Sequence, residues 1–137
     1  MSNKATTQHN KLPMPGTKVR GSKTGKPIMA LLDLLGRTWA LGIIWHLNTA
    51  PATFRELQER CEQISPSLLN TRLKELKSLS IITTNEQGYT LTEQGQDLFG
   101  IISPLGLWSK SWAKQINDSE HNKAMNTTID NSTDSKQ

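Results

Sequence analysis

The run ISPSLLNTRLKELKSLSIITTNEQGYTL, residues 64–91, places a helical pattern directly before a strand pattern. In its first half, Leu73 and Leu76 fall within about 40° of Leu69 around a helix axis, which gives one apolar face. The pair Ser65-Pro66 is typical of a helix start, because the serine hydroxyl can cap a backbone N–H and proline has no N–H to lose. The first half therefore predicts a helix that begins near residue 65.

The second half of the run has the pattern of a short hairpin. Residues 81–84 and 89–91 are rich in β-branched and aromatic side chains, and residues 85–88, Asn-Glu-Gln-Gly, supply the turn between them. Almost no linker separates the helix from this hairpin. A recognition-type helix followed directly by a hairpin is the layout of a winged helix. We therefore expect a mainly α fold with a small β-hairpin wing.

The polar face of the expected helix 65–79 carries hydrogen-bonding and cationic side chains. The major groove of B-DNA admits one α-helix, and Asn70 is the best candidate for reading a base edge, since its amide can both donate to and accept from adenine. Arg72 borders the apolar face, so it could instead cover apolar surface or pair with a carboxylate. An ordinary solvated face is the alternative for the whole stripe. The candidate DNA-contacting residues of this helix are Ser67, Asn70, Thr71, Arg72, Lys74 and Lys77.

Three helices are expected upstream of this run. Residues 28–35 form a short apolar stretch, and Thr38 is a candidate cap for WALGIIWHLN, whose apolar residues cover nearly all sides and predict a buried helix. Thr53 is a candidate cap for FRELQERC, which together with the helix from residue 65 gives a helix-turn-helix. At the start of that third helix, Thr53 and Arg55 are further candidates for contacting DNA phosphate.

Downstream of the hairpin, the pattern predicts two more helices. Thr92 is a candidate cap for EQGQDLFGII, and beyond residue 104 an apolar stripe recurs at helical spacing with no partner left in so small a domain. We interpret this stripe as a dimer surface, so the fold gains an additional C-terminal dimerisation helix. The stripe consists of Leu105, Trp108, Trp112 and Ile116.

Composition divides the 137 residues and the net charge of +4 into three parts. Residues 1–26 hold six lysines and arginines and no acid, so we expect residues 1–25 to be a disordered basic arm. Residues 26–116 form the single winged-helix and dimerisation domain, and bases and acids are in balance over residues 27–116. Residues 117–137 have a charge of −2 and few apolar side chains, which predicts a disordered tail.

The sequence offers little for catalysis or metal binding. No catalytic constellation is visible, so we expect no enzyme activity and no cofactor, and the single cysteine rules out an internal disulfide and makes a zinc site improbable. No apolar signal segment or membrane span is present, so a cytoplasmic location is expected. His46 and Cys61 fit buried structural roles better than a catalytic or sensor role. A pocket for a small-molecule effector beside Trp39 and Trp45 is an alternative to a plain core role.

The stretch from Lys26 to Ala113 resembles the HxlR family of bacterial winged-helix transcriptional regulators. LLDLLGRTWALGIIWHL is similar to the helix pair of that family, TFRELQERCEQIS to its next helix and turn, and LLNTRLKELKSLSII to its recognition helix, with YTLTEQGQDL after the wing. The resemblance covers about two-thirds of the chain in unbroken order, which is more specific than a helix-turn-helix match alone. It implies a homodimeric regulator that binds double-stranded DNA.

Two departures from the family pattern bear on function. Many members have a Cys-Pro pair, in some of them an oxidant or electrophile sensor, where this chain has Lys26-Pro27, and lysine cannot perform that chemistry. The wing is shorter than usual, and its tip at residues 85–88 has an acid and no base, which puts wing contact with phosphate in doubt.

Our principal hypothesis is sequence-specific binding of double-stranded DNA by a homodimer; activation and repression stay equally open. The rival is a winged-helix protein-interaction module that has lost DNA binding.

Overall fold

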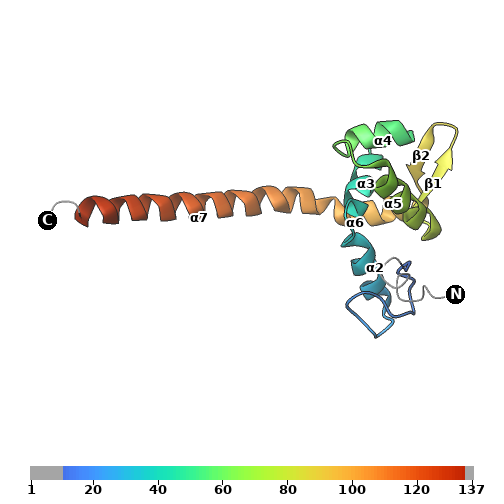
Figure 1. Ribbon diagram of the computed structural model, residues 1–137, viewed down its shortest axis with the longest axis horizontal. Coiled ribbons are helices and arrows are strands. Elements are labelled where there is room, and N and C mark those ends of the chain that lie inside the picture. The colour runs from blue at the N-terminus through green and yellow to red at the C-terminus, as the bar shows by residue number, and fades with distance from the viewer. Residues whose placement is uncertain (1–10, 135–137) are drawn as a thin grey trace. The chain divides into compact units, whose positions relative to one another are not determined.

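The computed structural model describes residues 11–134 and divides the chain into two units, one ending at Phe99 and the other beginning at Gly100. Figure 1 shows six helices and one hairpin in these residues. Their bounds are α2 (Pro27–Leu35), α3 (Ala40–Leu47), α4 (Phe54–Arg60), α5 (Pro66–Ser78), β1 (Ile82–Asn85), β2 (Gly88–Leu91), α6 (Glu93–Ile102) and α7 (Pro104–Asp134).

The core of the first unit gathers around α3. Ile43 and Ile44 are completely buried, as expected for a helix with apolar residues on most sides, and the apolar face of α5 packs in the same core. The α3 helix contacts both α2 and α4, and α5 contacts β1. Burial of these aliphatic side chains is the main source of stability for so small a unit. Its largest fully buried side chains are Ile43, Ile44, Leu57, Leu69, Leu76, Ile82 and Cys61.

Three of the four predicted helix caps are confirmed. The Thr53 hydroxyl accepts the Glu56 N–H at 3.2 Å, and the Ser65 hydroxyl accepts the Leu68 N–H at 3.3 Å. The Thr92 hydroxyl accepts the Gly95 N–H at 3.0 Å. Each cap satisfies one of the N–H groups that the first turn of a helix leaves unpaired.

The fourth cap, Thr38, is wrong. The α3 helix begins at Ala40, and its N-cap is Trp39, which has a φ of 69° and makes no side-chain cap. The carbonyl of Thr38 instead accepts a hydrogen bond from Arg72 at 2.8 Å. Tertiary contact with α5 thus decides how the chain enters α3.

The hairpin follows the predicted pattern and gains a third short partner. β1 and β2 are antiparallel, with Ile82 opposite Leu91, and a two-residue turn at 86–87 joins them. Ala52 and Tyr89 exchange two backbone hydrogen bonds of 2.9 and 2.7 Å, so the segment before α4 extends the sheet. A Cβ at Gly88 would lie 2.4 Å from the Ala52 carbonyl oxygen, and its φ is 121°. Only glycine fits at that crossing.

The segment before α2 has more regular structure than the expected disordered arm. Gly16 donates to the Gly25 carbonyl at 3.0 Å, and Val19 and Ser22 exchange hydrogen bonds of 2.9 and 3.1 Å, which closes a loop over residues 16–25. Gly16, Gly21 and Gly25 have positive φ values that let the chain turn this tightly. Residues 1–10, the first part of the expected arm, lie outside the described residues.

The second unit consists of the end of α6 and the whole of α7. The α7 helix continues to Asp134, whereas a disordered tail was expected from residue 117. No proline or glycine follows Gly106, so nothing in the local sequence interrupts the helical hydrogen bonds. Side chains from residue 107 to 128 are exposed, so packing within the described chain does not hold this part of the helix. Residues 135–137 lie outside the described part of the chain.

No single helix within residues 11–134 is long and apolar enough to cross a membrane. Helices α2 and α3 together meet that criterion but are bent by 85°.

Candidate nucleic-acid interface

The outward face of α5 presents five of the predicted side chains to solvent. Asn70 and Lys74 are exposed on adjacent turns, and the Thr71 hydroxyl donates to the Ser67 carbonyl at 2.9 Å, which leaves its lone pairs outward. The Lys77 ammonium lies 3.5 Å from the hydroxyl of Thr84 on β1. The structure therefore brings Ser67, Asn70, Thr71, Lys74 and Lys77 together along one face of α5.

Arg72 does not share this face. Its side chain is 15% exposed; Nε donates to the Thr38 carbonyl and Nη1 donates to Glu75 Oε1 at 2.7 Å. Burial lowers the pKa of Arg72 from its ordinary value, and the nearby charge of Arg37 lowers it further. Pairing with a carboxylate was one of the alternatives that the sequence left open for Arg72, and it is the one that the structure shows.

The carboxylate of Glu75 joins α5 to the junction between α2 and α3. Glu75 is buried, and its second oxygen accepts from Nη1 of Arg37, whose side chain is 12% exposed. Nη2 of Arg37 also approaches Asp33 at 3.5 Å and donates to the Lys11 carbonyl at 2.6 Å. Buried charges are tolerated when they are paired in this way. Sequence reasoning missed this network, although Glu75 lies on the same side of α5 as Arg72, away from the outward face.

The start of α4 holds the other two predicted phosphate ligands. Thr53 and Arg55 are both exposed. The Thr53 hydroxyl accepts from the Glu56 backbone N–H and donates to the Glu56 carboxylate at 3.1 Å, so these two hydrogen bonds occupy it. The α4 helix is tied to α3 by Arg60, which donates to the carbonyls of His46 at 3.1 Å and Ala50 at 3.2 Å. Arg55 is therefore better placed than Thr53 to reach an external anion.

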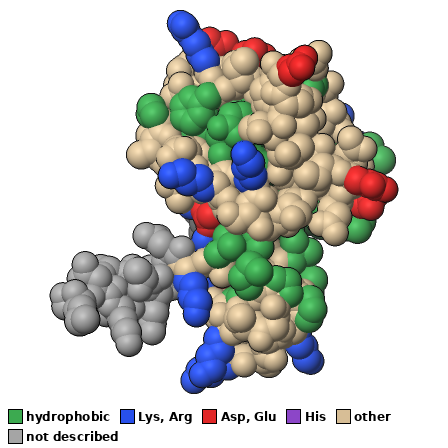
Figure 2. Space-filling model, turned by 90° about the vertical axis from the view of Figure 1, so that its right-hand side faces the viewer, with side chains coloured by type: hydrophobic (Ala, Val, Ile, Leu, Met, Phe, Trp, Pro, Cys, Tyr) green, Lys and Arg blue, Asp and Glu red, His purple; other side chains and the backbone are tan. Residues whose placement is uncertain are grey.

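The tip of the wing has the character expected from the sequence. Asn85, Glu86 and Gln87 are exposed, and the Asn85 side chain accepts the Gln87 N–H at 2.8 Å to fix the turn. The tip contributes one negative charge and no positive one. Figure 2 shows separate Lys and Arg side chains on this side of the molecule and no continuous basic patch. Contact with DNA would therefore depend on the face of α5.

The predicted apolar stripe lies on α7 in the second unit. Its four residues are each about half exposed or more, with Trp108 at 61% and Trp112 at 51%. The two indole rings stack with centroids 5.8 Å apart and planes 11° from parallel. Ile101 and Leu107 are also exposed apolar residues, which sequence reasoning did not include. Large apolar surface such as that of the four-residue stripe is typical of an interaction site, and Leu107 lies outside this stripe.

Cys61, Trp39 and Trp45, which the sequence raised as a possible sensor and a possible pocket, are packed against other parts of the first unit. Cys61 is completely buried, and burial raises the pKa of its thiol, with Glu62 adding to the rise and Arg60 opposing it. The Trp45 ring packs edge-on against Phe99 at 5.4 Å, and a Cβ at position 42 would lie 2.6 Å from the Trp39 ring. Within residues 11–134, no three or more His, Cys, Asp or Glu side chains are grouped to hold a metal ion.

A capped helix-turn-helix followed by a hairpin defines the class of winged-helix DNA-binding proteins. The chain belongs to the family of HxlR-like helix-turn-helix proteins, whose model matches residues 34–117. It is therefore a DNA-binding transcriptional regulator.

Relatives from Bacillus subtilis agree with this membership. The HTH-type transcriptional regulator YodB is 33% identical over 89 residues, which cover 60% of this chain and 80% of that protein. The uncharacterized HTH-type regulator YybR is 27% identical over 97 residues, which cover 66% of this chain and 78% of that protein. The crystal structure of quinone-bound YodB superposes with a TM-score of 0.57, covering 61% of this chain and 96% of that one.

Proposed function

We propose that the protein binds duplex DNA with α5 in the major groove and regulates transcription by occupying an operator. The single observation that carries this proposal is the outward face of α5, where amide, hydroxyl and ammonium groups are exposed together while the opposite side of the helix is fixed in the core. The Ser65 cap and the Glu75 network hold α5 in place, and preorganisation of this kind lowers the entropy lost on binding.

Within this face we assign different tasks to different side chains. Asn70 reads a base edge, because a carboxamide can form two hydrogen bonds with adenine. Lys74 and Lys77 contact phosphate, as does Arg55 from the start of α4. Arg72 keeps α5 in position and does not touch DNA, because its Nε and Nη1 are already bonded inside the protein and its side chain is only 15% exposed.

We further propose that the protein is a homodimer held by the apolar stripe of α7. One recognition helix offers few specific contacts, whereas a two-fold dimer places two helices on half-sites about one helical turn apart. The exposed Trp108 and Trp112 pair supplies the large aromatic surface that interfaces favour.

The test is an electrophoretic mobility shift with the upstream region of the protein's own gene, measured across a salt series. Binding should weaken steeply as salt rises, because each lysine or arginine on a phosphate releases counterions. A random duplex of equal length is the control, and it should bind more weakly with a similar salt slope. Failure to bind any duplex at low salt would contradict the proposal and favour the protein-interaction module.

A further inference from the structure

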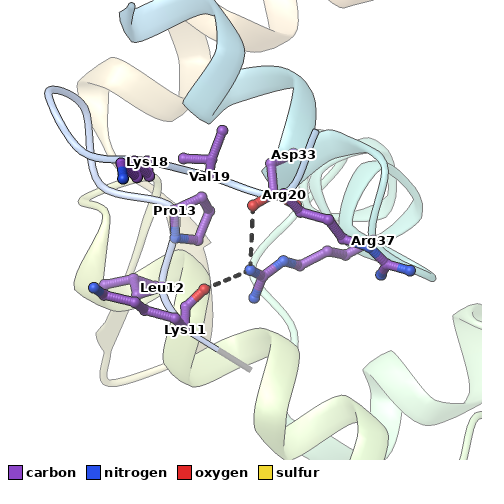
Figure 3. A pocket seen from close by; sticks show the side chains of 8 residues that line it. All are labelled: Lys11, Leu12, Pro13, Lys18, Val19, Arg20, Asp33 and Arg37. Carbon is purple, nitrogen blue, oxygen red and sulfur yellow. Dashed lines mark hydrogen bonds and ion pairs between the residues drawn. The ribbon is translucent and has the colours of Figure 1, made fainter. Parts of the chain in front are cut away.

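A pocket of about 370 Å³ lies between α2 and the segment that precedes it, and all of its lining residues except Arg37 precede the stretch that matches the family. Figure 3 shows Lys11, Leu12, Pro13, Lys18 and Val19 on one side of the pocket and Asp33, Arg20 and Arg37 on the other, with Arg37 reaching across to Lys11. The volume falls in the range of small-molecule sites, which is roughly 300 to 1,000 Å³. The pocket is thus large enough for a small ligand.

The lining of the pocket is strongly cationic. Lys11, Lys18, Arg20 and Arg37 line it together with a single acid, Asp33. Within the described residues, no carboxylate lies at ion-pair distance from Lys18 or Arg20, whereas Arg37 is held by Asp33 and Glu75. Charges of one sign around a concave surface reinforce one another and attract the opposite charge.

The same pocket has an apolar wall. Leu12 and Val19 are half-buried there, and Pro13 is buried. A bare inorganic ion would leave this wall in contact with water, whereas an organic anion with a short apolar body would cover it. We propose that the pocket binds a small organic carboxylate, with the cations of the lining around the carboxylate and the apolar wall against its body.

Arg37 connects this pocket to the recognition helix. Its Nη2 donates to the Lys11 carbonyl on the pocket side, and its Nη1 pairs with Glu75 of α5. A bound carboxylate competes with the Lys11 carbonyl and Asp33 for this guanidinium and so weakens the contact that holds α5. The ligand therefore lowers affinity for the operator, a step that rests on the proposed DNA-binding role of α5. Binding in the pocket itself does not depend on that role.

The experiment is a titration of the full-length protein, without DNA, followed by two-dimensional ¹H–¹⁵N NMR. Sodium benzoate and sodium hexanoate are the probes, and benzamide is the neutral control, with ionic strength held constant by sodium chloride. Both carboxylates at millimolar concentration should shift the amide signals of Asp33, Arg37 and the residues other than proline in 11–20, and benzamide should not.

Two variants of the same loop separate a specific site from general attraction by positive charge. Arg20→Gln should weaken benzoate binding by about tenfold, the value of one charge-assisted hydrogen bond. Lys23→Gln removes the same charge from an exposed residue that does not line the pocket, and it should leave binding unchanged. Equal losses in the two variants would overturn the proposed site.

Three other outcomes are decisive. Absence of shifts with both carboxylates would overturn the proposal. Shifts at these residues with a duplex of unrelated sequence, but not with either carboxylate, would identify a phosphate-backbone contact and also overturn it. Benzoate binding in the pocket with no change in operator affinity would overturn the coupling through Arg37. Failure of the protein to bind any duplex would contradict the proposed DNA-binding function and would leave the ligand site standing.

Discussion

The carboxylate of Glu75 gives the sharpest test of how α5 is held. Glu75→Gln keeps the size of the side chain and removes its charge, so Arg37 and Arg72 lose the anion between them. These guanidiniums are only 12% and 15% exposed, so water replaces the lost partner poorly. Removing one partner of a buried ion pair typically costs about 3 to 5 kcal/mol.

The lower end of that range applies to this site. Asp33 remains 3.5 Å from Arg37, and the carbonyls of Lys11 and Thr38 continue to accept from the two arginines. We therefore expect the free energy of unfolding to fall by about 3 kcal/mol, a large part of the roughly 5 to 15 kcal/mol that stabilises a typical domain.

Urea unfolding followed by circular dichroism measures this loss. With a slope of about 1.5 kcal/mol per molar urea, a loss of 3 kcal/mol lowers the midpoint by about 2 M. Glu59→Gln is the matched control, since Glu59 is exposed and the change should stay within about 0.5 kcal/mol. A loss of less than about 1 kcal/mol for Glu75→Gln would refute the view that the buried network holds α5.

Three other expectations concern DNA recognition, capping and the thiol. Asn70→Ala should cost about 1 to 3 kcal/mol at the operator and little on random DNA, whereas Lys74→Ala should weaken both; equal losses for Asn70→Ala on both duplexes would remove its base-reading role. Ser65→Ala should lower the free energy of unfolding by about 1 kcal/mol in urea melts, and no change would mean that the cap contributes nothing. Because burial raises its pKa, the Cys61 thiol should stay protonated and react slowly with iodoacetamide at pH 8. For the same reason the free energy of unfolding should fall as pH rises above the unfolded-state pKa of about 8.5. Alkylation as fast as in the urea-unfolded chain would contradict this.

The parts of the fold that the sequence predicted correctly depend on local signals. The α5 helix begins at Pro66 with Ser65 as its cap, because a hydroxyl and a proline at these two positions act within one turn of backbone. The strands β1 and β2 flank the predicted turn, since alternation and turn residues are also local properties. The outward face of α5 was predictable for the same reason, because helical periodicity alone separates exposed from buried positions.

The parts that escaped prediction depend on residues far apart in the sequence. The pairing of Arg37 with Glu75 spans 38 positions, and no periodic pattern reports such a contact. Thr38 resembled a cap, but its carbonyl is bonded to Arg72 and α3 starts beyond it. Tertiary contacts decided both positions, and they override local preference.

The helix from residue 117 to 134 differs from the expected tail for another reason. Composition predicted a segment that cannot build a core, and the exposed side chains of residues 117–128 agree with that. Composition alone does not determine backbone conformation. Because residues 117–134 hold no proline or glycine to break a helix, the backbone continues as one although the segment builds no core.

The dimer can be tested on a single helix with an internal control. At about 100° per residue around α7, Trp108 and Trp112 lie about 40° apart, whereas Leu107 lies about 100° from Trp108 and about 140° from Trp112. All three are exposed, with Leu107 at 76%, so a glutamate at any of them should be compatible with folding of the described chain. We expect Trp108→Glu combined with Trp112→Glu to give a folded monomer with reduced operator affinity.

Leu107→Glu is the matched control, because it adds the same charged side chain to the same helix while leaving the stripe intact. It should remain a dimer in sedimentation velocity and bind the operator normally. Dissociation of the dimer by the tryptophan changes alone would mean that the stripe holds the two copies together. Aromatic side chains bury more surface in an interface than most others, so their loss weakens it most. A double variant that stays dimeric, or a wild-type protein that is monomeric at micromolar concentration, would show that α7 does not form the interface, and the two recognition helices would then need another means of reaching paired half-sites.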